Sequence, residues 1–129
     1  MNSEELYLEM RALHPALFSA SDKDRLGFCF GIGWVALVRD LMGALADLRR
    51  KGSFRVVQVK EKFGTLRVYV AMGEESPGLR SEVYHVLAMF EGRSTVTCER
   101  CGSGQGVLLH EPWDRVRCPK CQLFGALED

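Results

Sequence analysis

Four cysteines near the C-terminus form two identical pairs, and their spacing constrains the fold more than any other feature of the sequence. Cys98 and Cys101 enclose two residues, Cys118 and Cys121 enclose two more, and sixteen residues (102–117) separate the pairs. Two such pairs at this separation are typical of a tetrahedral zinc site. Because four thiolates fill the coordination sphere of Zn²⁺ and leave no position for water or substrate, we expect one structural zinc ion.

Two other chemistries use paired cysteines, and both fit this sequence less well. A thioredoxin-like dithiol needs a single pair after a strand in a βαβ unit. An iron–sulfur cluster also takes four thiolates, although the short spacing within each pair suits zinc better. The fifth cysteine, Cys29, lies between two phenylalanines, and we expect it to be a small buried apolar side chain.

The composition is that of a globular protein, with 47% hydrophobic and 26% charged residues. For 129 residues we predict an α+β core over 1–93 and a zinc-ribbon lobe over 94–129. The 17 basic and 17 acidic residues balance, which argues against a protein whose main role is to coat nucleic acid. Since no run of about 18 apolar residues occurs and the N-terminus is acidic, we expect a cytoplasmic protein without a membrane partner.

Hydrophobic periodicity predicts three helices, and residues that commonly cap or end helices mark their boundaries. Ser3 and Ser76 are the expected N-terminal caps of the first and third helices, and Pro15 and Gly52 follow the ends of the first and second. We expect helices over residues 3–13, 34–51 and 77–92.

Two segments between the second and third helices are rich in β-branched and aromatic residues, which predicts a β-hairpin. We expect strands over residues 54–59 and 65–71, joined by a loop over 60–64. Alternation places Arg67 and Tyr69 on the polar face of the second strand, with Arg55 near Arg67 across the pair. In the zinc segment we expect strands over 95–97 and 107–109, and residues 114–117 lead into the second pair of cysteines. The expected fold class is therefore α+β, with two or three helices on a small antiparallel sheet and a C-terminal four-cysteine zinc ribbon.

The segment from Leu26 to Gly33 is apolar but rich in glycine. We expect a short strand or a tight loop that brings its backbone close to something else, either a ligand or another segment. Gly31-Ile32-Gly33 precedes a helix, but it lacks the third glycine and the lysine of a phosphate-binding loop, so it is a weak signal for a nucleotide site.

These segments resemble a family of small uncharacterised proteins common in bacterial and phage genomes. The resemblance spans residues 28–121 and is carried by Gly31-Ile32-Gly33-Trp34, the hairpin from Val57 to Tyr69, Cys98-Glu99-Arg100-Cys101-Gly102, Trp113 and the pair Cys118 and Cys121. Family members more often have glycine at Thr65 and an acidic residue at Ile32, and the second difference argues against a catalytic carboxylate in that loop. The resemblance implies a bacterial or mobile-element setting and a zinc ribbon, without a particular activity.

The stretch 49–67 is strongly basic, with Glu61 as its one acidic residue. Its basic residues are Arg49, Arg50, Lys51, Arg55, Lys60, Lys62 and Arg67. Phe63 and Tyr69 are interspersed with them. Lysine and arginine bind the phosphates of a nucleic acid whatever its base sequence, and aromatic rings stack on bases. This combination of residues indicates a nucleic-acid-binding hairpin. The alternative is a solvated sheet face beside a helix C-terminus, which is the commoner reason for such a charged run.

The leading hypothesis is a non-enzymatic, zinc-stabilised interaction protein, bacterial or phage, that binds and modulates a macromolecular protein partner. Neutral net charge, a closed metal site and the lack of a convergent acid–base set favour it. The expected tips of the zinc knuckles are Glu99, Arg100, Pro119 and Lys120. The candidate partner-binding residues are Arg55, Lys60, Lys62, Arg67, Tyr69, Arg100 and Lys120.

Two alternatives remain open. The first is a nucleic-acid-binding module that uses the basic hairpin 49–67. The second is a small enzyme, which would need a pocket that gathers His85 or His110 with Glu61, Glu74 or Glu75. No small-molecule substrate is evident from the sequence.

Overall fold

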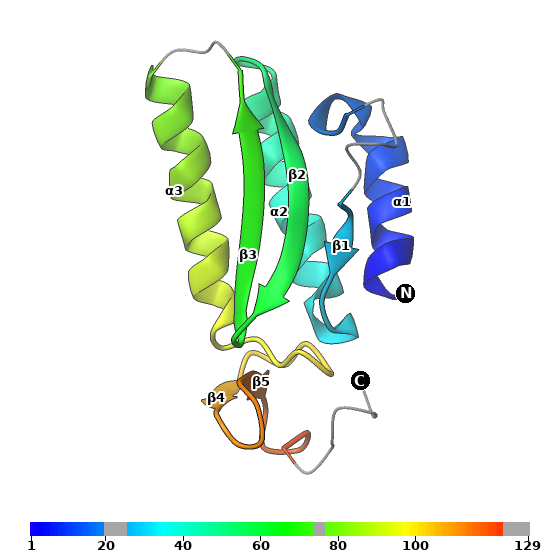
Figure 1. Ribbon diagram of the computed structural model, residues 1–129, viewed down its shortest axis with the longest axis vertical. Coiled ribbons are helices and arrows are strands. Elements are labelled where there is room, and N and C mark those ends of the chain that lie inside the picture. Colours follow the sequence, from blue (N-terminus) through cyan, green and yellow to red (C-terminus); the bar gives the residue numbers. More distant parts are fainter. Residues whose placement is uncertain (20–25, 74–76, 123–129) are drawn as a thin grey trace.

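The computed structural model describes residues 1–19, 26–73 and 77–122, and these form the predicted α+β fold (Figure 1). Helices pack on one side of a three-stranded sheet, and a second, two-stranded sheet lies in a small lobe at one end. None of the helices in these ranges is long and apolar enough to cross a membrane. The elements are α1 (Ser3–Leu13), β1 (Phe28–Cys29), α2 (Val35–Arg49), β2 (Phe54–Lys62), β3 (Thr65–Met72), α3 (Pro77–Ser94), β4 (Val107–Leu109) and β5 (Arg115–Arg117), with short 3₁₀ helices at Pro15–Leu17 and Ile32–Trp34.

Helix α1 is capped by Asn2, so the prediction of Ser3 as its cap is wrong. The Asn2 side chain accepts a hydrogen bond from the Glu5 N–H at 2.9 Å, and the Glu5 carboxylate accepts one from the Asn2 N–H at 3.0 Å. This capping box satisfies two backbone donors at once. Ser3 is instead the first helical residue, and its hydroxyl donates to the Phe28 carbonyl. The other predicted cap, Ser76, lies outside the described residues.

The hairpin is longer and its turn tighter than the sequence predicts. Strands β2 and β3 pair up to Lys62 and Thr65, which leaves only Phe63 and Gly64 in the turn instead of a loop over 60–64. Both turn residues have positive φ, 55° and 77°, as a two-residue turn of type I′ requires. A bulge near Val57 shifts the register farther along β2.

The sheet order is β1-β2-β3, with β1 parallel to β2 and β2 antiparallel to β3. The inner face packs against the helices and contributes to one large apolar core, with Phe54, Val56, Val59, Leu66 and Val68 buried. In Figure 1 α2 lies behind β2 and β3, while the front of these strands carries no helix. The sheet is therefore covered on one face and open on the other.

The predicted proximity of Arg55 and Arg67 is wrong. The two-residue turn pairs Lys62 with Thr65, so Lys60 opposes Arg67, and Arg55 opposes Ala71 near the far end of the hairpin. Both arginines are still exposed, and Arg67 and Tyr69 share the polar face as predicted.

The predicted strand over 95–97 is also wrong, because these residues continue from α3 as a turn. The N–H groups of Thr95, Val96 and Thr97 donate to the carbonyls three residues earlier. Strands β4 and β5 pair antiparallel as expected for a ribbon. The buried cysteines form an apolar cluster separate from the main core, while the independent folding of the two predicted domains stays a prediction.

Candidate functional site

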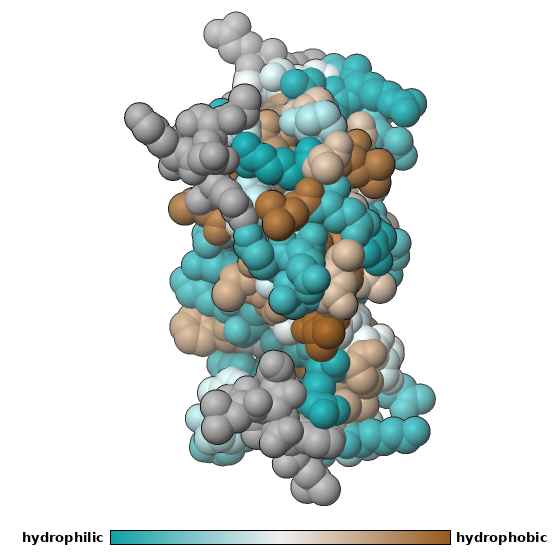
Figure 2. Space-filling model, turned by 90° about the vertical axis from the view of Figure 1, so that its right-hand side faces the viewer, coloured by the Kyte–Doolittle hydropathy of each residue, from teal (hydrophilic) through white to brown (hydrophobic). Residues whose placement is uncertain are grey.

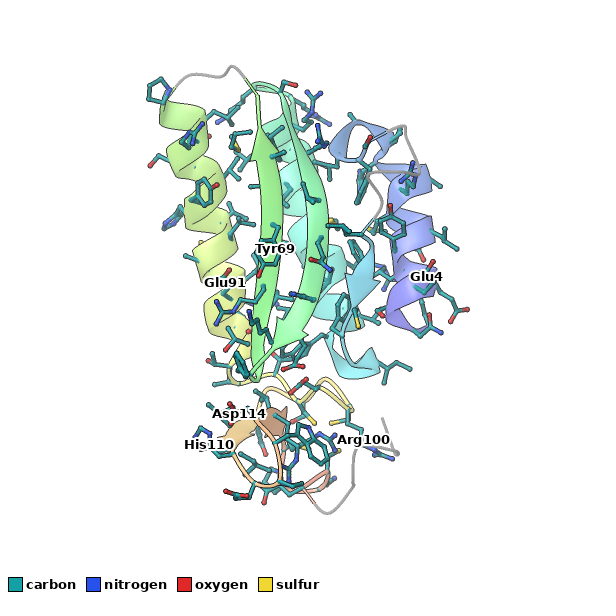
Figure 3. All side chains as sticks on the ribbon, in the orientation of Figure 1. Glu4, Tyr69, Glu91, Arg100, His110 and Asp114 are labelled. Carbon is teal, nitrogen blue, oxygen red and sulfur yellow. The ribbon has the colours of Figure 1, made fainter. Side chains whose placement is uncertain are left out.

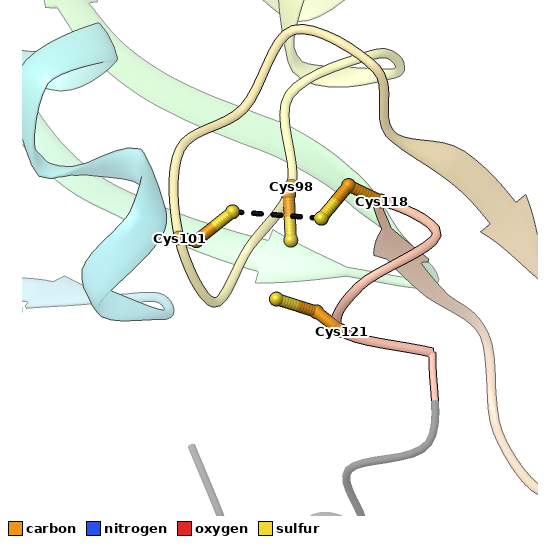
Figure 4. Close-up of side chains that lie close together, drawn as sticks. All are labelled: Cys98, Cys101, Cys118 and Cys121. Carbon is orange, nitrogen blue, oxygen red and sulfur yellow. Dashed lines mark hydrogen bonds between the residues drawn. The ribbon is translucent and has the colours of Figure 1, made fainter.

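The four paired cysteines converge on one point in the small lobe (Figure 4). Their sulfur atoms all lie within 4.8 Å of one another, and the Sγ atoms of Cys101 and Cys118 are 3.6 Å apart. The thiols are free, with Cys101 exposed and the other three buried. Four sulfurs at the corners of a tetrahedron around Zn²⁺ would be about 3.8 Å apart, since Zn–S bonds are about 2.3 Å long. The donor set therefore fits a four-thiolate metal site.

Backbone hydrogen bonds shape the first knuckle. The Gly102 N–H donates to the Cys98 carbonyl at 2.9 Å, and the Cys98 N–H donates to the Ser103 carbonyl at 2.8 Å. Gly102 has a φ of 84°, which a residue with a side chain rarely adopts. Near the second pair, the Arg100 guanidinium lies 3.8 Å from the Cys121 sulfur. Such donors orient thiolates and offset part of their charge.

The environment favours unequal ionisation of the thiols. Burial raises the pKa of Cys98, but hydrogen bonds from the backbone of Cys118, Cys101 and Arg100 outweigh it and lower the pKa to about 7. The Ser103 backbone lowers the pKa of Cys101, but burial and the neighbouring thiols raise it to about 12. Burial also raises the pKa of Cys121. A bound cation would reverse these upward shifts, because metal coordination requires thiolates.

The first knuckle is docked on the start of α2. The Gly33 N–H donates to the Glu99 carbonyl at 2.8 Å, and the buried Trp34 indole N–H donates to the Thr97 carbonyl at 2.8 Å. A Cβ atom on Gly33 would lie 2.2 Å from the Cys98 carbonyl oxygen. The expected close approach of the glycine-rich segment 26–33 is present, and its neighbour is the backbone of the first knuckle.

Of the predicted knuckle tips, Pro119 and Lys120 are exposed and Arg100 is half-buried. Glu99 is only 8% exposed, so its prediction as a tip is wrong. Its carboxylate points inward and accepts a hydrogen bond from the Val116 N–H at 2.5 Å, while its own N–H donates to the Val116 carbonyl. Glu99 therefore links the first knuckle to β5.

The hairpin residues predicted to bind a partner gather on the open face of the sheet. The register places Arg55, Lys60, Lys62, Arg67 and Tyr69 on this face, which we call the outer face. Figure 3 shows Tyr69 on the side of the sheet turned away from α2. Within the described ranges none of the four cations forms an ion pair. The face therefore carries uncompensated positive charge.

The other predicted basic residues lie elsewhere. Arg49 donates to the carbonyls of Ala16 and Gly52, and Lys51 pairs with Glu82 at 3.1 Å. These contacts agree with the alternative interpretation of a helix C-terminus that favours cations. Arg100 and Lys120 belong to the small lobe. The structure thus divides the basic stretch and keeps only its hairpin part on the outer face, where Lys60, Lys62 and Arg67 lie near the turn and Arg55 lies near the other end.

Cys29 is exposed, so the prediction that it is buried is wrong. Parallel pairing sets Phe28 opposite Val59 and Cys29 opposite Lys60. Since Phe28 turns into the core, its neighbour turns to the outer face. The parallel pairing is a non-local contact that the sequence pattern does not reveal.

Among the described residues, neither His85 nor His110 shares a groove with Glu61, one of the carboxylates that the enzyme alternative names. His85 is exposed on α3, and His110 Nδ1 lies 2.7 Å from an Asp114 carboxylate oxygen. Figure 3 shows both His110 and Asp114 in the small lobe. Glu61 lines a groove of about 550 Å³ together with Cys29, but neither histidine is among the described residues lining it. Glu61 accepts a hydrogen bond from the Gly64 N–H at 2.7 Å. Glu74 and Glu75 lie outside the described residues.

Sequence reasoning missed two features of the site. Phe63 is a turn residue with positive φ and an exposed ring. The sequence pattern predicts a five-residue loop, in which Phe63 has no special position. Strand β5 is wholly buried although two of its three residues are arginines, and composition alone predicts such residues on the surface.

Comparison with known proteins gives no match: no family model, no curated protein and no solved structure is significantly similar to this chain.

Proposed function

We propose that the chain is a zinc-stabilised, non-enzymatic module that binds nucleic acid on the outer face of its sheet. One observation carries the proposal: Arg55, Lys60, Lys62 and Arg67 share a helix-free face, and no described acidic side chain pairs with them. Phosphates are the common ligand of such a surface, since their charge is present whatever the base sequence. Because the whole chain has zero net charge, binding would depend on local positive charge of the kind that this face carries.

Zinc is the metal best suited to the four-cysteine site. Four thiolates at tetrahedral spacing are its usual structural ligands, and the ion would cross-link the two knuckles without taking part in chemistry. The cross-linked lobe would support the hairpin, because Gly64 packs so closely on it that an added Cβ would lie 2.5 Å from Leu108 Cδ1. The metal therefore has an indirect role in the proposed binding.

A protein partner is the second candidate, and a different surface favours it. A groove of about 730 Å³ beside the first knuckle is lined by the exposed apolar residues Ile32 and Val96 and by Arg93 and Arg100. On the α1 side of the molecule, Figure 2 shows hydrophobic side chains scattered among hydrophilic ones. Scattered apolar residues are normal on a protein surface, so this side does not indicate a binding partner. The expectation of a bacterial or phage setting stays a prediction.

The test measures binding of a labelled oligonucleotide to the metal-loaded protein by fluorescence anisotropy. Affinity is expected to fall steeply with salt, with a logarithmic slope of about −3 for four phosphate contacts on a single strand. Lys60→Glu and Arg67→Glu should each weaken binding about ten-fold or more. Arg50→Glu changes the charge equally at the end of α2 and should leave binding close to that of the unmodified protein.

Absence of binding at low salt, or equal losses in all three variants, would refute nucleic-acid binding by this face. A protein captured through the knuckle groove, and lost with Val96→Glu rather than with Lys60→Glu, would favour the second candidate.

A further inference from the structure

The turn of the hairpin combines two features that are unfavourable for phenylalanine. Phe63 has a φ of 55°, a conformation that is an outlier for a bulky side chain, and 66% of the residue is exposed. Asparagine followed by glycine is the sequence that this turn type prefers. An exposed aromatic ring on strained backbone is a reason to look for a function, because strain of this kind is concentrated at binding and switching sites.

The turn is held in place from more than one side. The Gly64 N–H donates to the Glu61 carboxylate at 2.7 Å, and Gly64 packs against Leu108 and the backbone of Arg115 in the small lobe. The Phe63 ring is thus presented at a fixed end of the outer face rather than on a free loop. Preorganised presentation lowers the entropic cost of binding.

A second ring lies on the same face, and each ring has a lysine beside it. Tyr69 is 42% exposed, and its ring centroid is 5.7 Å from the Lys60 ammonium. The Lys62 ammonium is likewise 5.7 Å from the centroid of the Phe63 ring. Tyr69 opposes Gln58 and Phe63 directly follows Lys62, so the two ring-bearing positions lie five residues, roughly 17 Å, apart along the hairpin. This separation is longer than the step between adjacent nucleotides, so the two rings would meet bases that are not direct neighbours.

We propose that these two units bind separate nucleotides of one single-stranded nucleic acid. The rings of Phe63 and Tyr69 stack on bases, and the ammonium groups of Lys60 and Lys62 contact the neighbouring phosphates. A duplex hides the faces of its bases, so it offers these rings nothing to stack on. This inference rests on the proposed function and adds the ligand class and the role of the two rings.

Phe63→Asn separates binding from folding. Asparagine suits the turn, so the variant should unfold at a higher temperature than the unmodified protein. It also removes a stacking ring and should weaken binding of a single-stranded oligonucleotide about ten-fold. A phenylalanine with a merely structural role would not give this combination of higher stability and lower affinity.

Tyr69 provides a matched pair of variants. Tyr69→Phe keeps the stacking surface and should bind the same oligonucleotide nearly as well as the unmodified protein. Tyr69→Leu keeps an apolar side chain but loses the aromatic face, so its affinity should fall about ten-fold. In NMR spectra of the isotope-labelled unmodified protein, the Phe63 and Tyr69 ring resonances should shift upfield when the oligonucleotide is added.

The outcomes distinguish this inference from the proposed function. If Phe63→Asn and Tyr69→Leu bind as the unmodified protein does, or if a duplex of the same sequence binds equally tightly, the single-strand inference is overturned. Loss of binding in Lys60→Glu would then still support the proposed function. If the unmodified protein binds no oligonucleotide at low salt, both are overturned.

Discussion

The backbone N–H of Gly33 donates a hydrogen bond to the carbonyl of Glu99 at 2.8 Å, which joins the start of α2 to the first cysteine knuckle. This contact is backbone to backbone, and it depends on Gly33 having no side chain. The adjacent Trp34 indole donates to the Thr97 carbonyl and reinforces the junction. The cysteine lobe is therefore attached to the core through α2 as well as through the chain that follows α3.

Gly33→Ala is expected to disrupt this junction. The new Cβ would lie 2.2 Å from the Cys98 carbonyl oxygen and 2.7 Å from the Gly102 backbone nitrogen, so the knuckle would have to move. We expect a loss of about 3 kcal/mol in the free energy of unfolding, measured by urea denaturation. Gly43→Ala is the control: it lies in α2 with nothing within 4 Å of its Cβ position, and it should stabilise the protein by about 1 kcal/mol. Equal effects of the two variants would contradict the close packing at Gly33.

Cys101→Ser tests the metal centre. We expect one zinc ion per chain in the unmodified protein, and removal of one of the four thiolates should reduce the bound zinc to a small fraction, as measured by elemental analysis. Hydrogen exchange should show residues 95–121 losing protection while α1 and the hairpin keep theirs, since the main core contains none of these cysteines. A chelator that leaves residues 95–121 protected would refute a structural metal.

Cys29 should be the fast-reacting thiol of the metal-loaded protein. It is exposed on the outer face and is not among the four clustered cysteines, whereas metal ligands are protected by coordination. Titration with a thiol reagent should give one rapid equivalent, which disappears in Cys29→Ser, and five equivalents after chelation. A slow or absent first equivalent in the metal-loaded protein would contradict the exposure of Cys29.

Ser94→Ala is expected to destabilise the edge of the sheet. The buried Ser94 hydroxyl accepts a hydrogen bond from the Leu66 N–H at 3.1 Å and donates to the Glu91 carbonyl at 2.5 Å. Its loss leaves a buried donor on β3 unsatisfied, which costs about 2 kcal/mol. Thermal unfolding measures this loss. Thr95→Ala is the control: it removes an exposed hydroxyl that donates to the Gly92 carbonyl, and it should cost less than about 0.5 kcal/mol in the same experiment.

Local patterns predicted most of the secondary structure. The apolar stripe of α2, the β-branched segments of the hairpin and the cysteine spacing each depend on residues close in sequence, and the elements they predict are present. The predicted cap of α1 was wrong because Asn2 and Ser3 are both good capping residues, and only the reciprocal bond with Glu5 distinguishes them.

Features that depend on distant contacts could not be predicted. The exposure of Cys29 follows from the parallel pairing of β1 with β2, and the burial of Glu99 follows from its bond to Val116. The outer face depends on the register of β2 and β3, which the two-residue turn Phe63–Gly64 sets. The sequence pattern predicts a longer loop over 60–64 instead. The basic residues were predicted individually, but their division between two surfaces required the tertiary structure.

The hydrogen bond from Trp34 to Thr97 has a consequence for the order of folding during synthesis. Its two residues are separated by 63 positions, and the acceptor leaves the ribosome only after the whole sheet and α3 have been made. The Trp34 indole therefore forms its hydrogen bond only after Thr97 has left the ribosome, and the second cysteine pair leaves later still. We therefore predict that metal binding comes late in folding, and that chains made without the metal keep α1, α2 and the hairpin while residues 95–121 are open to proteases.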